Sequence, residues 1–299
     1  MKEIITLLLM LLPLYAIGQI ANPIAEPLYF KIEDALSAKK ATQLNLRDQQ
    51  LFMIPDEIKD LKELRFLNLM RNNLEKWDEV LFSLQKIEEL NLKMNAIINV
   101  PSNISSLQRL ITLDLSNNKL TSVPPELGTL KNLHYLYLSL NAITSVPSLA
   151  KCKNLEVLVA DFNQMSSLPR ELSKLKKLKV LHLGYNQLYE IDNDEKLPES
   201  VEELHIEYNS LVRIPQQIGD LRNLKTLILD GNKIEVLPEE VGNLKKLEFL
   251  SLSNNVLQVL PQSVNDLKNL RTLVLTGNTI GQAERDRIQM ALPNCQIYF

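Results

Sequence analysis

Asparagine recurs at a fixed spacing along most of this chain. It stands at Asn72, Asn95, Asn118, Asn141, Asn163, Asn186, Asn209, Asn232, Asn255 and Asn278, and Gln49 holds the same phase one interval earlier. Successive positions are 23 residues apart, except for the 22 residues between Asn141 and Asn163. A period of this length is typical of a solenoid, in which each repeat stacks on its neighbours. Functional residues are therefore expected in exposed columns along the stack.

Each asparagine belongs to a longer pattern, LxxLxLxxNxL, which a proline usually follows. Alternating leucines such as Leu113 and Leu115 indicate a short strand with one buried face. Two further apolar columns, spaced by three residues, indicate a short helical turn on the outer side of the coil. The asparagine side chain is expected to hydrogen-bond the backbone of its own turn and of the next one, which requires the same residue in each layer.

This pattern resembles the leucine-rich repeat family in its 23-residue form, over roughly residues 41 to 299. The resemblance implies an α/β solenoid: a leucine-rich repeat horseshoe or arc with a parallel β-sheet on the concave face and short helical turns on the convex face. About eleven predicted repeats occupy residues 42–282. The resemblance also implies that function lies in the binding of macromolecules at the concave face.

The two ends of the chain lie outside the repeats. Lys2, an apolar run and small residues up to Gly18 form the pattern of a secretory signal peptide over residues 1–18. Because no second apolar stretch of spanning length follows, we expect no membrane span and a secreted, periplasmic or cell-surface protein after cleavage near Gly18. Residues 19–41 are predicted to hold a linker and a capping helix over about 27–40. Residues 283–299 are predicted to form a C-terminal cap with a helical turn and a final strand.

The cysteine content bears on the source of the chain. Secreted animal members of the family commonly carry cysteine-rich caps, whereas this chain has two cysteines, Cys152 in a core column and Cys295 in the cap. It therefore resembles exported bacterial members of the family. The two cysteines lie too many repeats apart for a disulfide. We expect a monomer.

Strand residues that alternate with the buried leucines should face the concave side. They are mostly polar in the first four repeats, whereas aromatic, histidine and carboxylate residues gather in the fifth to eighth. The predicted partner-binding residues are Tyr135, Tyr137, Leu140, Asp161, Phe162, His182, Tyr185, Glu203, His205, Glu207, Tyr208 and Asp230. Tyrosine is enriched at binding hot spots, and the four carboxylates are expected to form an acidic rim, so the predicted partner is a protein or peptide with basic and apolar groups. Alternatively, the aromatic residues only pack on one another across strands.

His182 and His205 occupy one column, one repeat apart, and their side chains are expected to lie about 5 Å apart. With Glu203, Glu207 or Asp161 nearby, the two histidines could bind zinc or form a pH-sensitive contact. Two stacked histidines can also arise by duplication of a repeat. The sequence is therefore interpreted as giving them a contact role in partner binding, with no metal and no cofactor.

Catalytic motifs such as GxSxG, HExxH and GxxxxGK do not occur in the sequence. Basic residues on the outer flank alternate with acidic ones and the net charge is −3, so no nucleic-acid partner is expected. We therefore expect a non-enzymatic protein-interaction module. The alternative is a glycan- or cell-envelope-binding module that uses the concave aromatic residues, and a structural spacer without a single partner is a third possibility.

Overall fold

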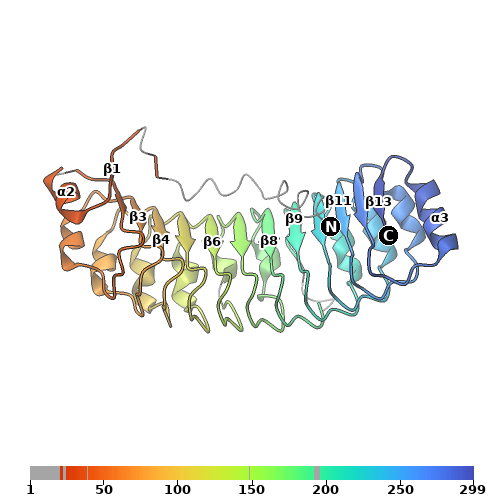
Figure 1. Ribbon diagram of the computed structural model, residues 1–299, viewed down its shortest axis with the longest axis horizontal. Coiled ribbons are helices and arrows are strands. Elements are labelled where there is room, and N and C mark those ends of the chain that lie inside the picture. The colour runs from red at the N-terminus through yellow and green to blue at the C-terminus, as the bar shows by residue number, and fades with distance from the viewer. Residues whose placement is uncertain (1–20, 23–24, 39, 148, 192–195) are drawn as a thin grey trace.

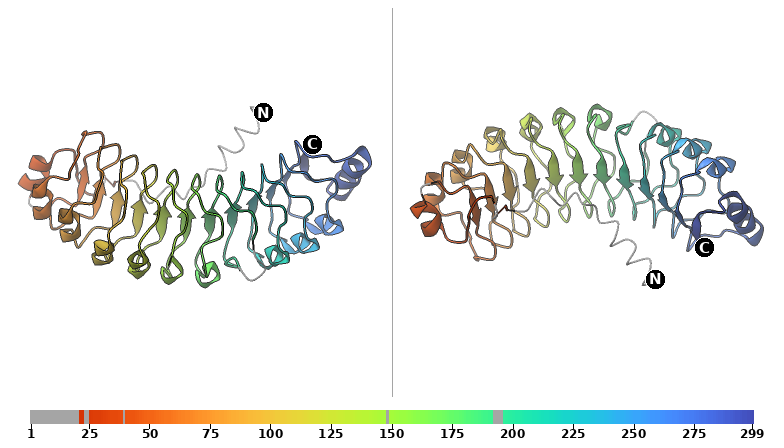
Figure 2. Two further views of the ribbon diagram at one scale, coloured as in Figure 1. Left: turned by 90° about the horizontal axis from the view of Figure 1, so that it is seen from below. Right: turned by 90° about the horizontal axis from the view of Figure 1, so that it is seen from above.

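The computed structural model describes residues 21–22, 25–38, 40–147, 149–191 and 196–299, and the predicted signal peptide over residues 1–18 lies outside them. The described residues form one elongated arc of stacked coils, with the N-terminal repeats at one end and the C-terminal repeats at the other (Figure 1). Strands line the inner side of the arc and short helical turns line its outer side (Figure 2). The predicted α/β solenoid with a concave parallel sheet is confirmed.

The described residues contain a single 13-stranded parallel sheet in which each strand pairs with the next along the chain. Its strands are β1 Leu28–Tyr29, β2 Gln43–Asn45, β3 Phe66–Asn68, β4 Glu89–Asn91, β5 Thr112–Asp114, β6 Tyr135–Tyr137, β7 Val157–Val159, β8 Val180–His182, β9 Glu203–His205, β10 Thr226–Ile228, β11 Phe249–Ser251, β12 Thr272–Val274 and β13 Gln296–Tyr298. The central leucines pair in constant register, as Leu181 does with Leu158 and Leu204. Because side chains alternate across a strand, the residues on either side of each leucine face the concave side.

Short 3₁₀ helices line the convex side. They are η2 Asp56–Asp60, η3 Glu79–Ser83, η4 Ser102–Ser106, η5 Pro125–Thr129, η6 Leu149–Lys151, η7 Leu172–Lys174, η8 Gln216–Asp220, η9 Glu239–Asn243 and η10 Gln262–Asp266. Each buries an apolar residue, such as Ile58 or Val241, in one continuous core with the strand leucines. Most follow a proline, such as Pro101, at a position where the helix requires no N–H donor.

The asparagines form a hydrogen-bonded ladder beside the sheet. In a representative layer, Asn209 Nδ2 donates to the carbonyl oxygens of Leu183, Ile206 and Glu207 at 3.0, 3.2 and 3.1 Å. Asn209 Oδ1 accepts the backbone N–H of Leu188 at 2.9 Å. Each side chain therefore satisfies its own turn and that of the preceding repeat, rather than the following repeat as the sequence suggested. The ladder fixes the backbone at the ends of β2 to β12, which include the strands of the candidate site.

A short helix and a strand cover each end of the core. At the N-terminal end, α2 Ile32–Ser37 buries Ala35, and β1 pairs with β2. The predicted helix over 27–40 is wrong in its first part, because the residues of β1 are extended and pair with the otherwise open edge of the sheet. At the C-terminal end, α3 Gln282–Ala291 buries Ile288, and β13 pairs with β12. Of the helices in the described residues, none has the length and apolar character to cross a membrane.

Candidate binding surface on the concave face

The register of β6 to β9 places the predicted site residues in four adjacent columns of the concave face. Tyr135 and Glu203 precede the strand leucines in one column. A second column runs through Tyr137, Val159, His182 and His205, which pair in that order. The other two columns are formed by residues after each strand: Asp161, Glu207 and Asp230, then Leu140, Phe162, Tyr185 and Tyr208. One face of the sheet therefore carries all of them, although Val159 separates Tyr137 from the histidines.

Three rings from successive repeats form a continuous pile, called here the aromatic stack: Phe162, Tyr185 and Tyr208. The ring centroids of Phe162 and Tyr185 are 4.1 Å apart, and those of Tyr185 and Tyr208 are 4.4 Å apart, with interplanar angles of 10° and 17°. The three residues nevertheless remain 45%, 38% and 44% exposed. Leu140, one repeat earlier in the same column, is 47% exposed. The rings therefore stack face to face, and their edges remain open to solvent.

The backbone under the aromatic stack is in an uncommon conformation. Leu140, Phe162, Tyr185 and Tyr208 have φ values of 58°, 55°, 53° and 49°, in the left-handed region. For residues with a Cβ this region is disfavoured by roughly 1–2 kcal/mol, and bulky side chains are rare there. Later repeats fill the same position with Gly231, Asn254 and Gly277, two glycines and an asparagine that tolerate it. Large apolar side chains at this position are therefore not required by the turn.

A glycine sets the C-terminal end of the aromatic stack. Gly231 follows Tyr208 in the column, and a Cβ added to it would lie 2.5 Å from Tyr208 Cδ1. The Tyr208 ring therefore lies against the bare backbone of Gly231, in space that any other residue would occupy. Sequence reasoning missed this role of Gly231, although a glycine in a column of aromatic residues was a visible signal.

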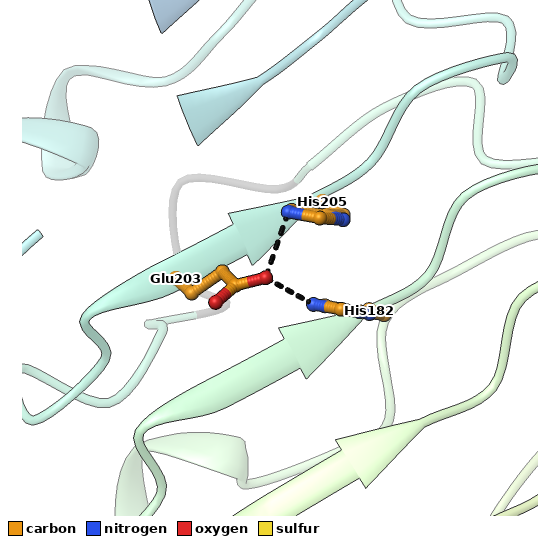
Figure 3. Close-up of side chains that lie close together, drawn as sticks. All are labelled: His182, Glu203 and His205. Carbon is orange, nitrogen blue, oxygen red and sulfur yellow. Dashed lines mark hydrogen bonds and ion pairs between the residues drawn. The ribbon is translucent and has the colours of Figure 1, made fainter. Parts of the chain in front are cut away.

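The two histidines and one glutamate form a compact cluster, called here the His–Glu cluster: His182, Glu203 and His205. The imidazole rings stack with centroids 3.8 Å apart and an interplanar angle of 3°, closer than the predicted spacing of about 5 Å. Both Nε2 atoms contact Glu203 Oε1, His182 at 2.9 Å and His205 at 3.0 Å (Figure 3). The side chains are only 12%, 13% and 17% exposed, so they are much more covered than the aromatic stack.

Burial and pairing shift the pKa values of this cluster in different directions. Burial alone would raise the pKa of Glu203, but the hydrogen bonds from both imidazoles hold it at about 2. Burial also opposes the charge on His182, yet its contacts with Glu203 and Asp161 outweigh burial and raise its pKa. The pKa of His205 is lowered by burial and by the neighbouring His182. His182 is therefore the imidazole of the pair that takes up a proton more readily.

The remaining carboxylates do not form the predicted acidic rim. Asp161, Glu207 and Asp230, called here the carboxylate row, lie between the histidine column and the aromatic stack. Asp161 Oδ1 accepts the backbone N–H of Gly184 at 2.8 Å, and Asp230 Oδ1 accepts the N–H of Ser253 at 2.7 Å. Asp161 and Asp230 therefore bond the backbone of the next repeat instead of extending outward. Burial raises the pKa of Asp161 and of Asp230, and it raises that of Glu207 to about 7.

Other tyrosines on this face stand apart from the aromatic stack. Tyr135 and Tyr137 both belong to β6, where burial first and Asp114 second raise the pKa of Tyr137 to about 12. Burial and the neighbouring Tyr208 likewise raise the pKa of Tyr185 to about 12. The phenols of Tyr137 and Tyr185 are therefore neutral at physiological pH, and can contact a partner by hydrogen bonding and packing but not by charge.

Sequence reasoning also missed an apolar cluster on the concave face beyond the aromatic stack. Ile228, Phe249 and Val274 are 3%, 6% and 2% exposed, and Tyr298 of the last strand packs against them. These residues cover one another across β10 to β13, so they contribute to stability rather than to an exposed surface. The exposed apolar surface of the concave face is therefore provided by the aromatic stack and Leu140.

Comparison with known proteins places this geometry in context. A family model described as a leucine-rich repeat region matches residues 79–214 and 213–288. No curated protein matches the chain. Among solved structures, the chain is similar to a leucine-rich repeat protein of Leptospira interrogans, with 32% identity over 88% of this chain and 85% of that one, and a TM-score of 0.49.

Two further solved structures have closer overall shapes. A plant peptide hormone receptor, solved in complex with RGF2, is 28% identical over 79% of this chain, which spans 40% of the receptor chain, with a TM-score of 0.69. An internalin from Listeria monocytogenes is 22% identical over 90% of this chain and 82% of that one, also with a TM-score of 0.69, and it demonstrates the shared fold alone. Since the family model matches well over half of the chain, the protein belongs to the leucine-rich repeat family.

Proposed function

We propose that this protein is a non-enzymatic module that binds a protein or peptide partner through the concave face of its fifth to eighth repeats. The aromatic stack is the observation that carries the proposal. Its three residues keep large rings exposed, one above another, at a backbone position that disfavours them, whereas the three following repeats use glycine or asparagine there. Such strain concentrates at functional sites, and exposed tyrosines provide contact area with little conformational entropy to lose.

The chemistry of this face indicates what the partner presents. The ring edges and Leu140 offer apolar contact, whereas Asp161 beside them keeps its side chain 19% exposed and provides a carboxylate. A basic side chain that reaches the carboxylate row would be enclosed on one side by aromatic rings, which also attract cations. The partner we propose is a segment that combines apolar residues with lysine or arginine.

The similarity to the plant receptor supports the same class of partner. That protein is described as a peptide hormone receptor in complex with RGF2, so a related solenoid binds a peptide. The present chain spans only 40% of that receptor chain, so the similarity supports a peptide or protein as the ligand class without specifying the ligand.

A glycan ligand is less consistent with the geometry. Sugars bind aromatic residues by lying on an open ring face, but both faces of Tyr185 are covered, by Phe162 and by Tyr208. Tyr208 in turn lies against Gly231. Ring edges suit the irregular side chains of a protein surface better than the flat face of a pyranose.

The proposal includes the chain's location and organisation. The signal-peptide pattern over residues 1–18 supports export to the cell surface, the periplasm or the medium. Residues 42–282 would then act as one binding solenoid, between an N-terminal cap over 19–41 and a C-terminal cap over 283–299. We propose that it acts as a monomer.

Selection of displayed random peptides on the full chain tests this proposal directly. We expect enriched peptides to share apolar residues with lysine or arginine, and their affinities to be measurable by titration calorimetry. The triple variant Tyr137→Ala, Tyr185→Ala and Tyr208→Ala should lose at least about 100-fold in affinity, as expected when hot-spot residues are removed together. The solenoid should stay folded, with a loss of stability limited to about 0.5–1.5 kcal/mol for each ring contact removed.

A double variant, Phe52→Ala with Tyr189→Ala, is the matched control. Both residues are more exposed than the aromatic stack, at 75% and 64%, and both lie three positions after the ladder residue of their repeat, away from the concave columns. Peptide affinity should not change in this control. Unaltered affinity in the triple variant, or glycan-array binding that the triple variant abolishes while no peptide is enriched, would overturn the proposal.

A further inference from the structure

We propose that His182, Glu203 and His205 form a binding site for a divalent transition-metal ion of the zinc class. One ligand atom from each residue lies within 4.8 Å of the other two. The site is separate from the aromatic stack, and the proposal does not depend on a peptide partner. Imidazole nitrogen and carboxylate oxygen are both established zinc ligands.

The distances within the His–Glu cluster are near those of a coordination shell. Both Nε2 atoms approach the same oxygen, at 2.9 and 3.0 Å. Around a tetrahedral zinc ion, with bonds of about 2.0–2.1 Å, neighbouring ligand atoms are about 3.3 Å apart. An ion that replaces the two hydrogen bonds would therefore lengthen both N–O separations by a few tenths of an ångström, with the imidazoles turning toward it, and it would displace the protons that the imidazoles now donate.

The backbone holds the two histidines in position before any ion binds. His182 and His205 are directly paired residues of the adjacent parallel strands β8 and β9. Their nearly parallel rings present both Nε2 atoms toward Glu203, which projects from β9 (Figure 3). Because strand residues are more rigid than loop residues, little ordering is required when the ion enters.

The surroundings are also those of a metal site. The second nitrogen of His182, Nδ1, faces Asp161 Oδ2 at 3.9 Å, and metal-bound histidines commonly hold a carboxylate on this side. Among the described residues, no hydrogen-bond partner reaches the buried Oε2 of Glu207, two residues after His205. Several carboxylates thus gather around two imidazoles in a partly buried space, where a divalent cation would offset their negative charge.

The ligand set restricts the class of ion. Two imidazoles and one carboxylate suit zinc, and imidazole ligands also suit nickel and copper. Calcium and magnesium prefer six or more oxygen ligands, which this site does not offer. Three protein ligands leave a fourth position toward the concave side for water or for a donor group of a partner.

Calorimetric titration of the untagged full chain with zinc chloride, after removal of metals with EDTA, tests the proposal. We expect one saturable equivalent of Zn²⁺ per chain and no saturable heat with calcium chloride. His182→Ala, His205→Ala and Glu203→Gln should each weaken zinc binding about 100-fold or more, since loss of a direct ligand exceeds the ~10–100-fold effect of outer residues. Cobalt substitution should give the intense visible absorption of a four-coordinate ion.

The third histidine of the chain provides the matched control. His134 lies just before β6 and hydrogen-bonds the carbonyl oxygen of Asn132, so His134→Ala should leave zinc affinity unchanged. Circular dichroism of each variant checks that the solenoid is intact, and Glu203→Gln preserves side-chain size. The proposal is overturned if no saturable zinc binding occurs, or if the three ligand variants bind zinc as the unaltered chain does. Peptide binding retained in these variants would leave the proposed function standing.

Discussion

Glu89 and Glu203 occupy the same position of their repeats, one on β4 and the other on β9, yet their surroundings differ sharply. Glu203 accepts hydrogen bonds from two imidazoles, and its pKa is about 2. For Glu89, burial first and the neighbouring Glu88 second raise the pKa to about 7, and no described residue provides a partner for its buried Oε2. Because the repeat gives both residues the same backbone, the difference arises from the side chains around each carboxylate.

The position that follows the carboxylate row gives a second comparison between regions. In the middle repeats it holds Phe162, Tyr185 and Tyr208, and in the later repeats it holds Gly231, Asn254 and Gly277, all with positive φ. The later repeats follow the preference of the backbone, and the middle repeats oppose it. Arg71 and Met94 in the early repeats also have positive φ here, so the middle repeats are distinguished by an uninterrupted run of large rings at a position that opposes them.

The largest expected effect is that of Glu203→Ala, measured as unfolding by urea in EDTA. The change leaves two mostly buried Nε2 atoms without their carboxylate partner, which should reduce the free energy of unfolding by about 2–3 kcal/mol. Glu202→Ala is the neighbouring control, because Glu202 pairs with Lys225 at a more exposed site and should contribute less than about 1 kcal/mol. Equal losses of stability in the two variants would contradict the claim that the His–Glu cluster stabilises the protein and distinguishes Glu203 from Glu89.

Gly231→Ala should have the next largest effect on stability, because it places a Cβ where the Tyr208 ring now lies against the bare backbone of Gly231. The left-handed backbone, with φ of 64°, and the contact with the Tyr208 ring should together lower the free energy of unfolding by about 2 kcal/mol. Near-ultraviolet circular dichroism should also change as the ring moves. Gly281→Ala is the control, since an added Cβ there would meet no atom within 4 Å. A Gly231→Ala protein as stable as this control would contradict the account of how the stack ends.

Most of the fold was predictable because its information is repeated in every layer. The asparagine period, the leucine alternation and the apolar columns each specify the same coil many times, so one irregular layer changes little. The N-terminal helix was placed wrongly because a single copy of local sequence was interpreted alone. The pairing of β1 with β2 depends on partners 15 residues further along the chain, as Leu28 pairs with Gln43. Caps break the repeat, and their structure depends on tertiary contacts.

The candidate site was predictable in its columns but not in its contacts. Strand alternation placed His182 and His205 side by side, yet it could not indicate that Glu203 turns toward the Nε2 atoms of both, because that depends on side-chain torsions. The acidic rim was wrong for a similar reason: the short side chain of Asp161 bonds the backbone of the next repeat instead of extending outward. The left-handed backbone under Tyr185 was also missed, since an aromatic residue gives no signal for a positive φ.

Glu89→Gln should change the free energy of unfolding by a smaller amount, and in the stabilising direction. The folded-state pKa of about 7 lies above the ordinary value of 4.5, so the unfolded chain loses its proton first as pH rises. Stability should therefore fall between about pH 4.5 and 7 and stay low above that range. Removing the charge should stabilise the protein by about 1 kcal/mol at pH 8, after discounting for solvent screening, and by almost nothing at pH 4. Thermal unfolding at both pH values measures this gain in stability. Glu57→Gln, on an exposed convex turn, is the control. A gain that does not depend on pH would contradict the prediction.

The smallest stability effect should come from Tyr185→Asn, which gives the middle of the aromatic stack a residue that later repeats use. Asparagine tolerates the left-handed backbone, and the relief of about 1 kcal/mol or more should nearly cancel the loss of two ring contacts worth about 0.5–1.5 kcal/mol each. The free energy of unfolding should therefore change by less than about 1 kcal/mol, while affinity for selected peptides falls and Tyr185→Phe retains it. If Tyr185→Asn instead lost far more stability than this, the rings would be explained as part of the fold, and the contrast with Gly231 would no longer indicate a binding surface.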